Sequence, residues 1–224
     1  ARVVTVSLTF VLGLKKNQSI IPAIREELIM DRFCLYVVLT RTNTVISRAI
    51  HWIKKDNYTH AAISLDEGLT QMYGFGRRKP YNPFIGCFRK EDISEGVYGI
   101  CRTLPGAIIE FEVTPQQYAK AQEIVEHFLV NKENYKYNYQ GLLFGLLNKP
   151  MAAGNSFLCS EFVYYVLNEC GVLDLNMPRS LIRPQNFLQG QGKVVFQGDL
   201  KALRPSSLPF APIYMLKTFL QLSR

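Results

Sequence analysis

The chain has 224 residues, of which 48% are hydrophobic and 20% are charged, so it can bury a full core and is not expected to be disordered. Its five cysteines form no CxxC pair and lie near no pair of histidines, which argues against a zinc site and suits a reducing compartment. The net charge of +8 favours acidic partners, but the basic residues are dispersed and do not alternate with aromatic ones as a nucleic-acid face requires.

The amino-terminal segment ARVVTVSLTFVLGLKK has features of both a secretion signal and a strand. Its apolar run is too short to span a bilayer, the stronger positive charge follows that run, and no A-x-A-like cleavage site is present. The partly alternating Val and Thr residues favour a strand. We therefore expect a cytoplasmic protein, while residues upstream of Ala1 could be missing from the sequence.

The first half of the chain alternates between helical and strand-like patterns. Apolar residues at helical spacing predict helices, and runs of β-branched and aromatic residues predict strands, two of which flank the turn DEG as a hairpin. In chain order these are a helix over 19–31, a strand over 33–39, a helix over 42–55, hairpin strands over 60–65 and 69–75, and strands over 97–104 and 107–113.

Three helices are predicted in the second half, which makes the overall pattern α+β. The first begins with a capping box, in which Thr114 is the N-cap residue and Gln117 closes the box. The third ends at Gly171, a typical C-cap residue. The expected spans are 114–130, 138–148 and 155–171.

Cys159 and His60 are the candidate catalytic residues. Cys159 opens the third helix, which Asn155 or Ser156 could cap, so its thiol is expected at the positive end of the helix dipole, where the nucleophilic thiolate is favoured. Backbone N–H groups at that end can also bind a developing oxyanion. His60 opens the first strand of the hairpin. The alternative is that Cys159 only packs in the core, where free cysteines are common.

The order of these two residues indicates a particular family. The cysteine follows the histidine by 99 positions (159 − 60), which reverses the papain order. The segments YTHAAISLD, MYGFGRR, NPFIGCF and FLCSEFVYYVLNECGV resemble the circularly permuted papain-like branch of the NlpC superfamily, including YiiX-like proteins. Lecithin retinol acyltransferase is a more distant relative with the same order. The resemblance covers roughly residues 33 to 190.

The resemblance implies an α+β fold in which a small antiparallel sheet packs against the helix that carries the nucleophile. It implies an amino-terminal extension (1–30), a catalytic domain (31–190) and a carboxyl-terminal extension (191–224) that packs on this domain. It also implies that Cys159 is the nucleophile and His60 the general base and later the acid, in an acyl-enzyme mechanism without a metal or a cofactor.

A third polar group normally orients the imidazole in such a site. The strand next to the histidine strand contains no His, Asp or Glu, and its candidates are Gln71 and Tyr73, which can both hydrogen bond. Arg78 is a candidate clamp for a carboxylate or phosphate. Tyr58 and Ser160, near the catalytic pair in sequence, are further candidates for substrate contact.

The expected function is hydrolysis of an amide or ester bond by an amidase-like or thiol-protease-like enzyme, as in bacterial peptidoglycan peptide cleavage. Two alternatives stay open, a lipid acyltransferase or thioesterase of the same fold and a non-catalytic binding module. GLLFGLLNKPM and FAPIYMLKTFLQL could make transient contact with a membrane or an anionic polymer, or could be ordinary core segments. The expected partners are a peptide or an acylated small substrate, without nucleic acid, and the chain is expected to be a monomer.

Overall fold

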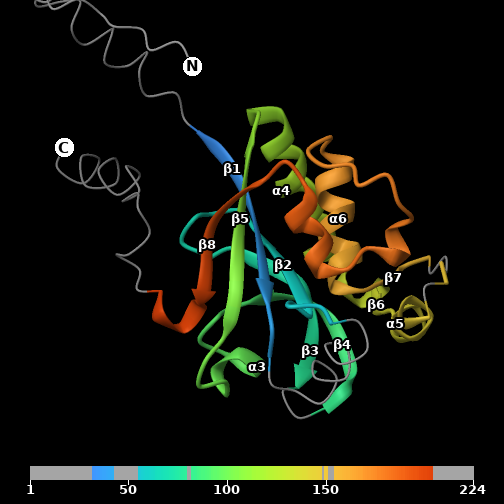
Figure 1. Cartoon of the computed structure of the whole chain (residues 1–224). Helices are drawn as coiled ribbons and strands as arrows, with labels where there is room; N and C mark the ends of the chain where they lie inside the picture. The colour runs from blue at the N-terminus through green and yellow to red at the C-terminus, as the bar shows by residue number, and fades with distance from the viewer. Residues whose placement is uncertain (1–31, 43–54, 80–81, 148, 151–153, 204–224) are drawn as a thin grey trace, which may run out of the picture. The chain divides into compact units, whose positions relative to one another are not determined.

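Six strands form one antiparallel sheet in the order β4-β3-β2-β1-β5-β8 (Figure 1). The computed structural model describes residues 32–42, 55–79, 82–147, 149–150 and 154–203. The strands are β1 (Phe33–Thr40), β2 (His60–Ser64), β3 (Met72–Lys79), β4 (Asn82–Glu91), β5 (Pro105–Val113) and β8 (Lys193–Asp199). The protein is therefore of the α+β class, with neighbouring strands of the sheet running in opposite directions.

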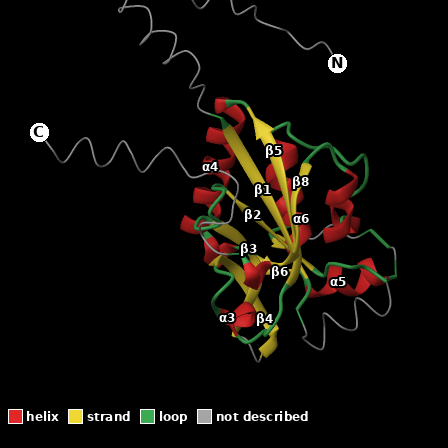
Figure 2. Cartoon of the chain, turned by 60° about the vertical axis from the view of Figure 1, so that its left-hand side comes forward, coloured by secondary structure: helices red, strands yellow, loops and turns green. Residues whose placement is uncertain are grey.

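Helices α4 and α6 pack against this sheet and against each other. Figure 2 shows the strands as one layer with helices beside it. Two short strands pair in parallel, one before α5 and one before α6, and so bring the starts of these helices together. The helices and short strands are α3 (Gly96–Gly99), α4 (Pro115–Val130), β6 (Lys136–Tyr137), α5 (Tyr139–Leu146), β7 (Ser156–Phe157) and α6 (Cys159–Glu169). Short 3-10 helices cover Lys132–Asn134, Arg179–Leu181, Pro184–Gln189 and Leu200–Ala202.

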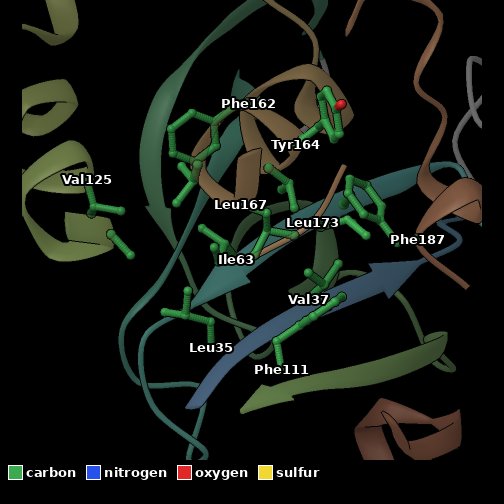
Figure 3. Packing of buried hydrophobic residues seen from close by; sticks show 14 of the residues in the cluster. Leu35, Val37, Ile63, Phe111, Val125, Phe162, Tyr164, Leu167, Leu173 and Phe187 are labelled. Carbon is green, nitrogen blue, oxygen red and sulfur yellow. The ribbon is translucent and has the colours of Figure 1, made fainter. Parts of the chain in front are cut away.

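Strand β1 is buried on both of its faces, which explains its unbroken apolar sequence. Its side chains alternate between two hydrophobic clusters, as the pleat of a strand requires. The larger cluster includes Leu35 and Val37 of β1 and residues of α4 and α6 (Figure 3). The smaller cluster, on the other face, includes Tyr98 of α3.

Five phenylalanines fix the start of α6 against the sheet. The centroids of neighbouring rings lie 4.9 to 6.2 Å apart, and many of the pairs meet edge to face. Such packing is specific in geometry, and truncating one buried phenylalanine typically costs about 3–5 kcal/mol. The five rings are Phe75 of β3, Phe88 of β4, Phe128 of α4, Phe157 of β7 and Phe162 of α6.

Most of the predicted elements in the described residues are confirmed. The capping box of Thr114 and Gln117 is present at the start of α4. The prediction of a strand over 97–104 is wrong, because a left-handed Gly96 (φ +58°) begins the helix α3 there. Strands β4 and β8 were not predicted. The strand and helix predicted before residue 32, and residues 43–54 of the helix predicted over 42–55, lie outside the described residues.

Strand β8 lies in the segment predicted as a carboxyl-terminal extension (191–224) that packs on the domain. It pairs with β5 and so adds residues 193–199 to the main sheet. Residues 1–30 and 204–224 lie outside the described part.

Candidate active site

Cys159 is the first residue of α6, as predicted, and is 6% exposed. The predicted capping by Asn155 or Ser156 is wrong, because the N-cap residue is Leu158 and Ser156 lies in β7. The Leu158 N–H instead donates a 2.6 Å hydrogen bond to the Glu161 carboxylate. A helix start leaves its first N–H groups without intrahelical acceptors, so Cys159 lies where an anion is stabilised.

His60 is the first residue of β2 and lies between two acidic or nucleophilic partners. Its Nε2 is 3.0 Å from Oε2 and 3.2 Å from Oε1 of Glu91. The thiol of Cys159 also acts on the imidazole and raises its pKa. Because Glu91 engages Nε2, Nδ1 is the ring nitrogen left for the thiol. The structure therefore brings together the histidine and the cysteine that the sequence singled out, which are 99 positions apart (159 − 60).

Glu91, the last residue of β4, is the polar group that faces the imidazole. It is 7% exposed, and its Oε2 also accepts a 2.8 Å hydrogen bond from the hydroxyl of Tyr98. A buried carboxylate requires such partners. Glu91 was not predicted, because it lies on β4, whereas the strand next to His60 in the sheet is β3.

The predicted orienting residues do not occupy this place. Gln71 is exposed, and it lies in the turn before β3, where its backbone N–H donates to Asp66. Tyr73 is opposite Ile63 in the β2–β3 pairing and not opposite His60. The hairpin prediction started β3 three residues too early, at Leu69, and this misplaced both side chains relative to His60.

Two glycines of β3 make room for the Glu91 carboxylate. A Cβ atom on Gly76 would lie 2.6 Å from Glu91 Oε1, and one on Gly74 would lie 3.2 Å from the same oxygen. These are the glycines of the MYGFGRR segment, for which the sequence alone gave no site role. They let the carboxylate lie against the strand and reach His60.

The charges of His60 and Glu91 stabilise each other inside the protein. Burial alone would lower the pKa of His60, but the Glu91 carboxylate and Cys159 hold it well above its ordinary value. Burial alone would raise the pKa of Glu91, but His60, together with Tyr98 and Arg89, holds it below its ordinary value. The site therefore favours a charged imidazolium paired with a carboxylate at neutral pH.

A pocket opens beside His60 and Glu91. Its walls combine aromatic and apolar side chains with the arginines Arg77 and Arg89, and Gly76 and Gly86 lie between them. Burial and then the charge of Cys159 raise the pKa of the Tyr137 phenol, which keeps it a hydrogen-bond donor. The lining residues that are aromatic or apolar are Phe75, Val97, Tyr98, Tyr137, Tyr139 and Leu142.

The candidate substrate-binding residues lie elsewhere. Tyr58 is 5% exposed and its hydroxyl accepts a hydrogen bond from Gln197. Ser160 is 3% exposed and donates a 2.6 Å hydrogen bond to the carbonyl of Ile182. Both hydroxyls therefore have hydrogen-bond partners within the fold around the site. The side chain of Arg78 lies outside the described part of the structure.

Comparisons with family models, curated proteins and solved structures found no match to this chain. In the described residues, no group of three or more His, Cys, Asp or Glu side chains is arranged to hold a metal ion. None of the helices that the structure describes has the length and apolar character needed to cross a membrane. The five cysteines, all of which lie in the described residues, are present as thiols.

Proposed function

We propose that the chain is a cysteine-dependent hydrolase of the permuted papain-like type, which cleaves an amide or ester bond through an acyl-enzyme. One observation carries the proposal: His60 pairs with Glu91 at the wall of a pocket, and the thiol of Cys159, at the start of a helix, acts on the same imidazole. A nucleophile, its base and a group that orients the base are the parts that this chemistry requires. The order of His60 before Cys159 agrees with the permuted branch.

In the first half of the reaction, the Cys159 thiolate attacks the carbonyl carbon of a substrate held in the pocket. The new oxyanion is stabilised by backbone N–H groups at the start of α6. The His60 imidazolium then gives its proton to the leaving amine or alkoxide, and the C–N or C–O bond breaks. A thioester on Cys159 and a neutral imidazole remain.

In the second half, His60 takes a proton from water, and the resulting hydroxide attacks the thioester carbonyl. The C–S bond breaks, the acid product leaves, and the thiolate and imidazolium are restored. Glu91 keeps the imidazole oriented and compensates its charge throughout. The reaction consumes one water for each bond that is cleaved and needs no further reactant.

One observation favours an acylated substrate with an apolar chain. Leu142 of α5 lines the pocket, and Phe144 and Leu147 further along the same segment are 39% and 61% exposed. Exposed apolar side chains within five positions of a pocket-lining residue are suited to binding an acyl chain. A lipid acyltransferase or thioesterase is therefore the second candidate function.

The proposal is tested by turnover with a panel that contains activated acyl esters of increasing chain length, a muropeptide and an isopeptide. We expect hydrolysis of at least one class and a loss of roughly a thousandfold or more in Cys159→Ser. Cys170→Ser, which changes the cysteine at the other end of α6, is the matched control and should keep full activity. Equal turnover in the wild type and Cys159→Ser would contradict the role of Cys159 as nucleophile, and no turnover of any substrate by the wild type would favour a binding module. Faster turnover with longer esters would favour the second candidate.

A further inference from the structure

Tyr98 is the second donor to the Glu91 carboxylate. It lies in the short helix α3 and is 7% exposed. Its hydroxyl donates at 2.8 Å to Oε2, the oxygen that is also 3.0 Å from His60 Nε2. The Tyr98 ring meets the imidazole edge to face, with centroids 6.0 Å apart. Tyr98 therefore contacts both members of the buried ion pair.

The position of the carboxylate is limited on two sides. Oε1 lies against β3, close enough that a Cβ atom on Gly76 would meet it at 2.6 Å. Oε2 lies between two donors, the imidazole and the phenol. Without the phenol, this largely buried oxygen would lose one of its two donors, and the carboxylate would be less firmly held against the imidazole.

We propose that Tyr98 is a positioning residue of this site, whose hydroxyl holds the Glu91 carboxylate in place against His60. The proposal rests on the proposed function, because it assigns Tyr98 a part in preparing the Cys159 thiolate. Tyr98 acts through Glu91 and His60 and takes no part in bond making or breaking.

The groups that act on Glu91 come from three elements. They are His60 of β2, Tyr98 of α3 and Arg89 of β4 itself, and all three favour the ionised carboxylate against the effect of burial. The facing positions of β3 are Gly74 and Gly76, which carry no charge. Loss of the Tyr98 hydroxyl should raise the pKa of Glu91, so the carboxylate should gain its proton at a higher pH than in the wild type.

The test follows the alkylation of Cys159 by iodoacetamide as pH falls, measured by mass spectrometry of the cysteine peptides. In the wild type we expect iodoacetamide to alkylate Cys159 well into the acid range. At still lower pH the alkylation rate should fall, because the coupled groups of Cys159, His60 and Glu91 take up protons; this fall is the acidic limb of the profile. In Tyr98→Phe the acidic limb should move upward by about one pH unit. The alkylation measurement needs no substrate.

Tyr164→Phe is the matched control. Tyr164 is 6% exposed and its hydroxyl also donates to a carboxylate, that of Asp174, at 2.9 Å. Its loss should leave the acidic limb of Cys159 unchanged, because it does not contact Glu91. A shift of equal size in both variants would show a general effect of stability and would overturn the proposal, as would an unchanged limb in folded Tyr98→Phe.

A second variant covers the case in which Tyr98→Phe fails to fold. Replacement of Tyr98 by 3-fluorotyrosine keeps the hydroxyl and nearly the same shape but makes the phenol a stronger donor, so the acidic limb should move to lower pH. An acidic limb that does not move, or that moves to higher pH, would contradict the proposal.

Failure of the proposed function gives a different result. In that case wild-type Cys159 reacts no faster than Cys170 in the acid range, whatever residue stands at position 98.

Discussion

Helix α6 carries a cysteine at each end, and the two are buried almost equally, with Cys159 6% and Cys170 7% exposed. Cys170 is the C-cap residue, and burial raises its pKa to about 11, although Lys120 acts in the opposite direction. Cys159 lies at the start of the helix and acts on the imidazole of His60, whose pKa it raises. Exposure therefore does not separate a candidate nucleophile from a structural thiol in this protein, whereas helix end and charged neighbours do.

Removal of the base should make Cys159 resemble Cys170. In His60→Ala we expect a loss of roughly 10²- to 10⁴-fold in turnover, because the thiol loses both its proton acceptor and the compensating positive charge. The loss should be measured as kcat/KM with the best ester substrate. His127→Ala is the control, since His127 is exposed on α4 and hydrogen bonds with Tyr135. Full activity in His60→Ala would show that His60 does not distinguish Cys159 from Cys170.

The glycines of β3 offer a test that leaves the cysteine and histidine intact. Gly76→Ala should displace the Glu91 carboxylate and lower turnover by up to about a hundredfold, since small misplacements in an active site have effects of that size. The thermal midpoint should change little, because the atom that must move ends a side chain. Gly74→Ala, where the contact would be 3.2 Å, should have a smaller effect. A larger loss in Gly74→Ala than in Gly76→Ala would contradict this geometry.

The ion pair predicts a wide pH optimum with two limbs. Glu91 has a lowered pKa in the folded protein, so its carboxylate is kept as pH falls until that pKa is crossed. His60 has a raised pKa, so the imidazolium is kept as pH rises until that higher pKa is crossed. Activity should therefore span neutral pH and fall about tenfold per pH unit beyond each limb. The measurement is kcat/KM across pH. An alkaline limb near the ordinary pKa of histidine would argue against the pairing of His60 with Glu91.

The smallest effects are expected at the residues that the sequence proposed as orienting groups. Gln71→Ala and Tyr73→Phe should each change kcat/KM by less than about twofold, because neither residue lies beside His60. Glu91→Gln, assayed alongside, should lose far more. A loss of kcat/KM in Gln71→Ala as large as that in Glu91→Gln would support the orienting role that the sequence suggested for Gln71.

The sequence predicted Cys159 and His60 of the candidate site and missed Glu91, which pairs with His60. The helix start at Cys159 and the strand start at His60 were readable because local patterns mark where elements begin. Glu91 was not, since β4 has a mixed sequence, NPFIGCFRKE, whose membership in the sheet depends on pairing with β3. Tyr98 was hidden for a related reason, because α3 lies in a segment whose apolar run is typical of a strand.

The strands of the sheet also differ in how far the sequence alone predicts them. β1 and β5 are long apolar runs and could be predicted directly, whereas β8 (KVVFQGD) is half exposed along its length and is recognised only through its pairing with β5. The capping box of α4 was predictable because both partners lie within four residues. Contacts within a few residues could thus be read from the sequence, whereas those that depend on strand order could not.

The central claim is that Cys159, and not Cys170, forms a covalent acyl intermediate. The most direct measurement is mass spectrometry of the intact protein and of its cysteine peptides after brief incubation with p-nitrophenyl acetate. The account predicts one acetyl group on Cys159 in the wild type and in Cys170→Ser, and none in Cys159→Ser. An acetyl group on Cys170, Cys34, Cys87 or Cys101 in place of Cys159, or ester turnover that survives in Cys159→Ser, would contradict it.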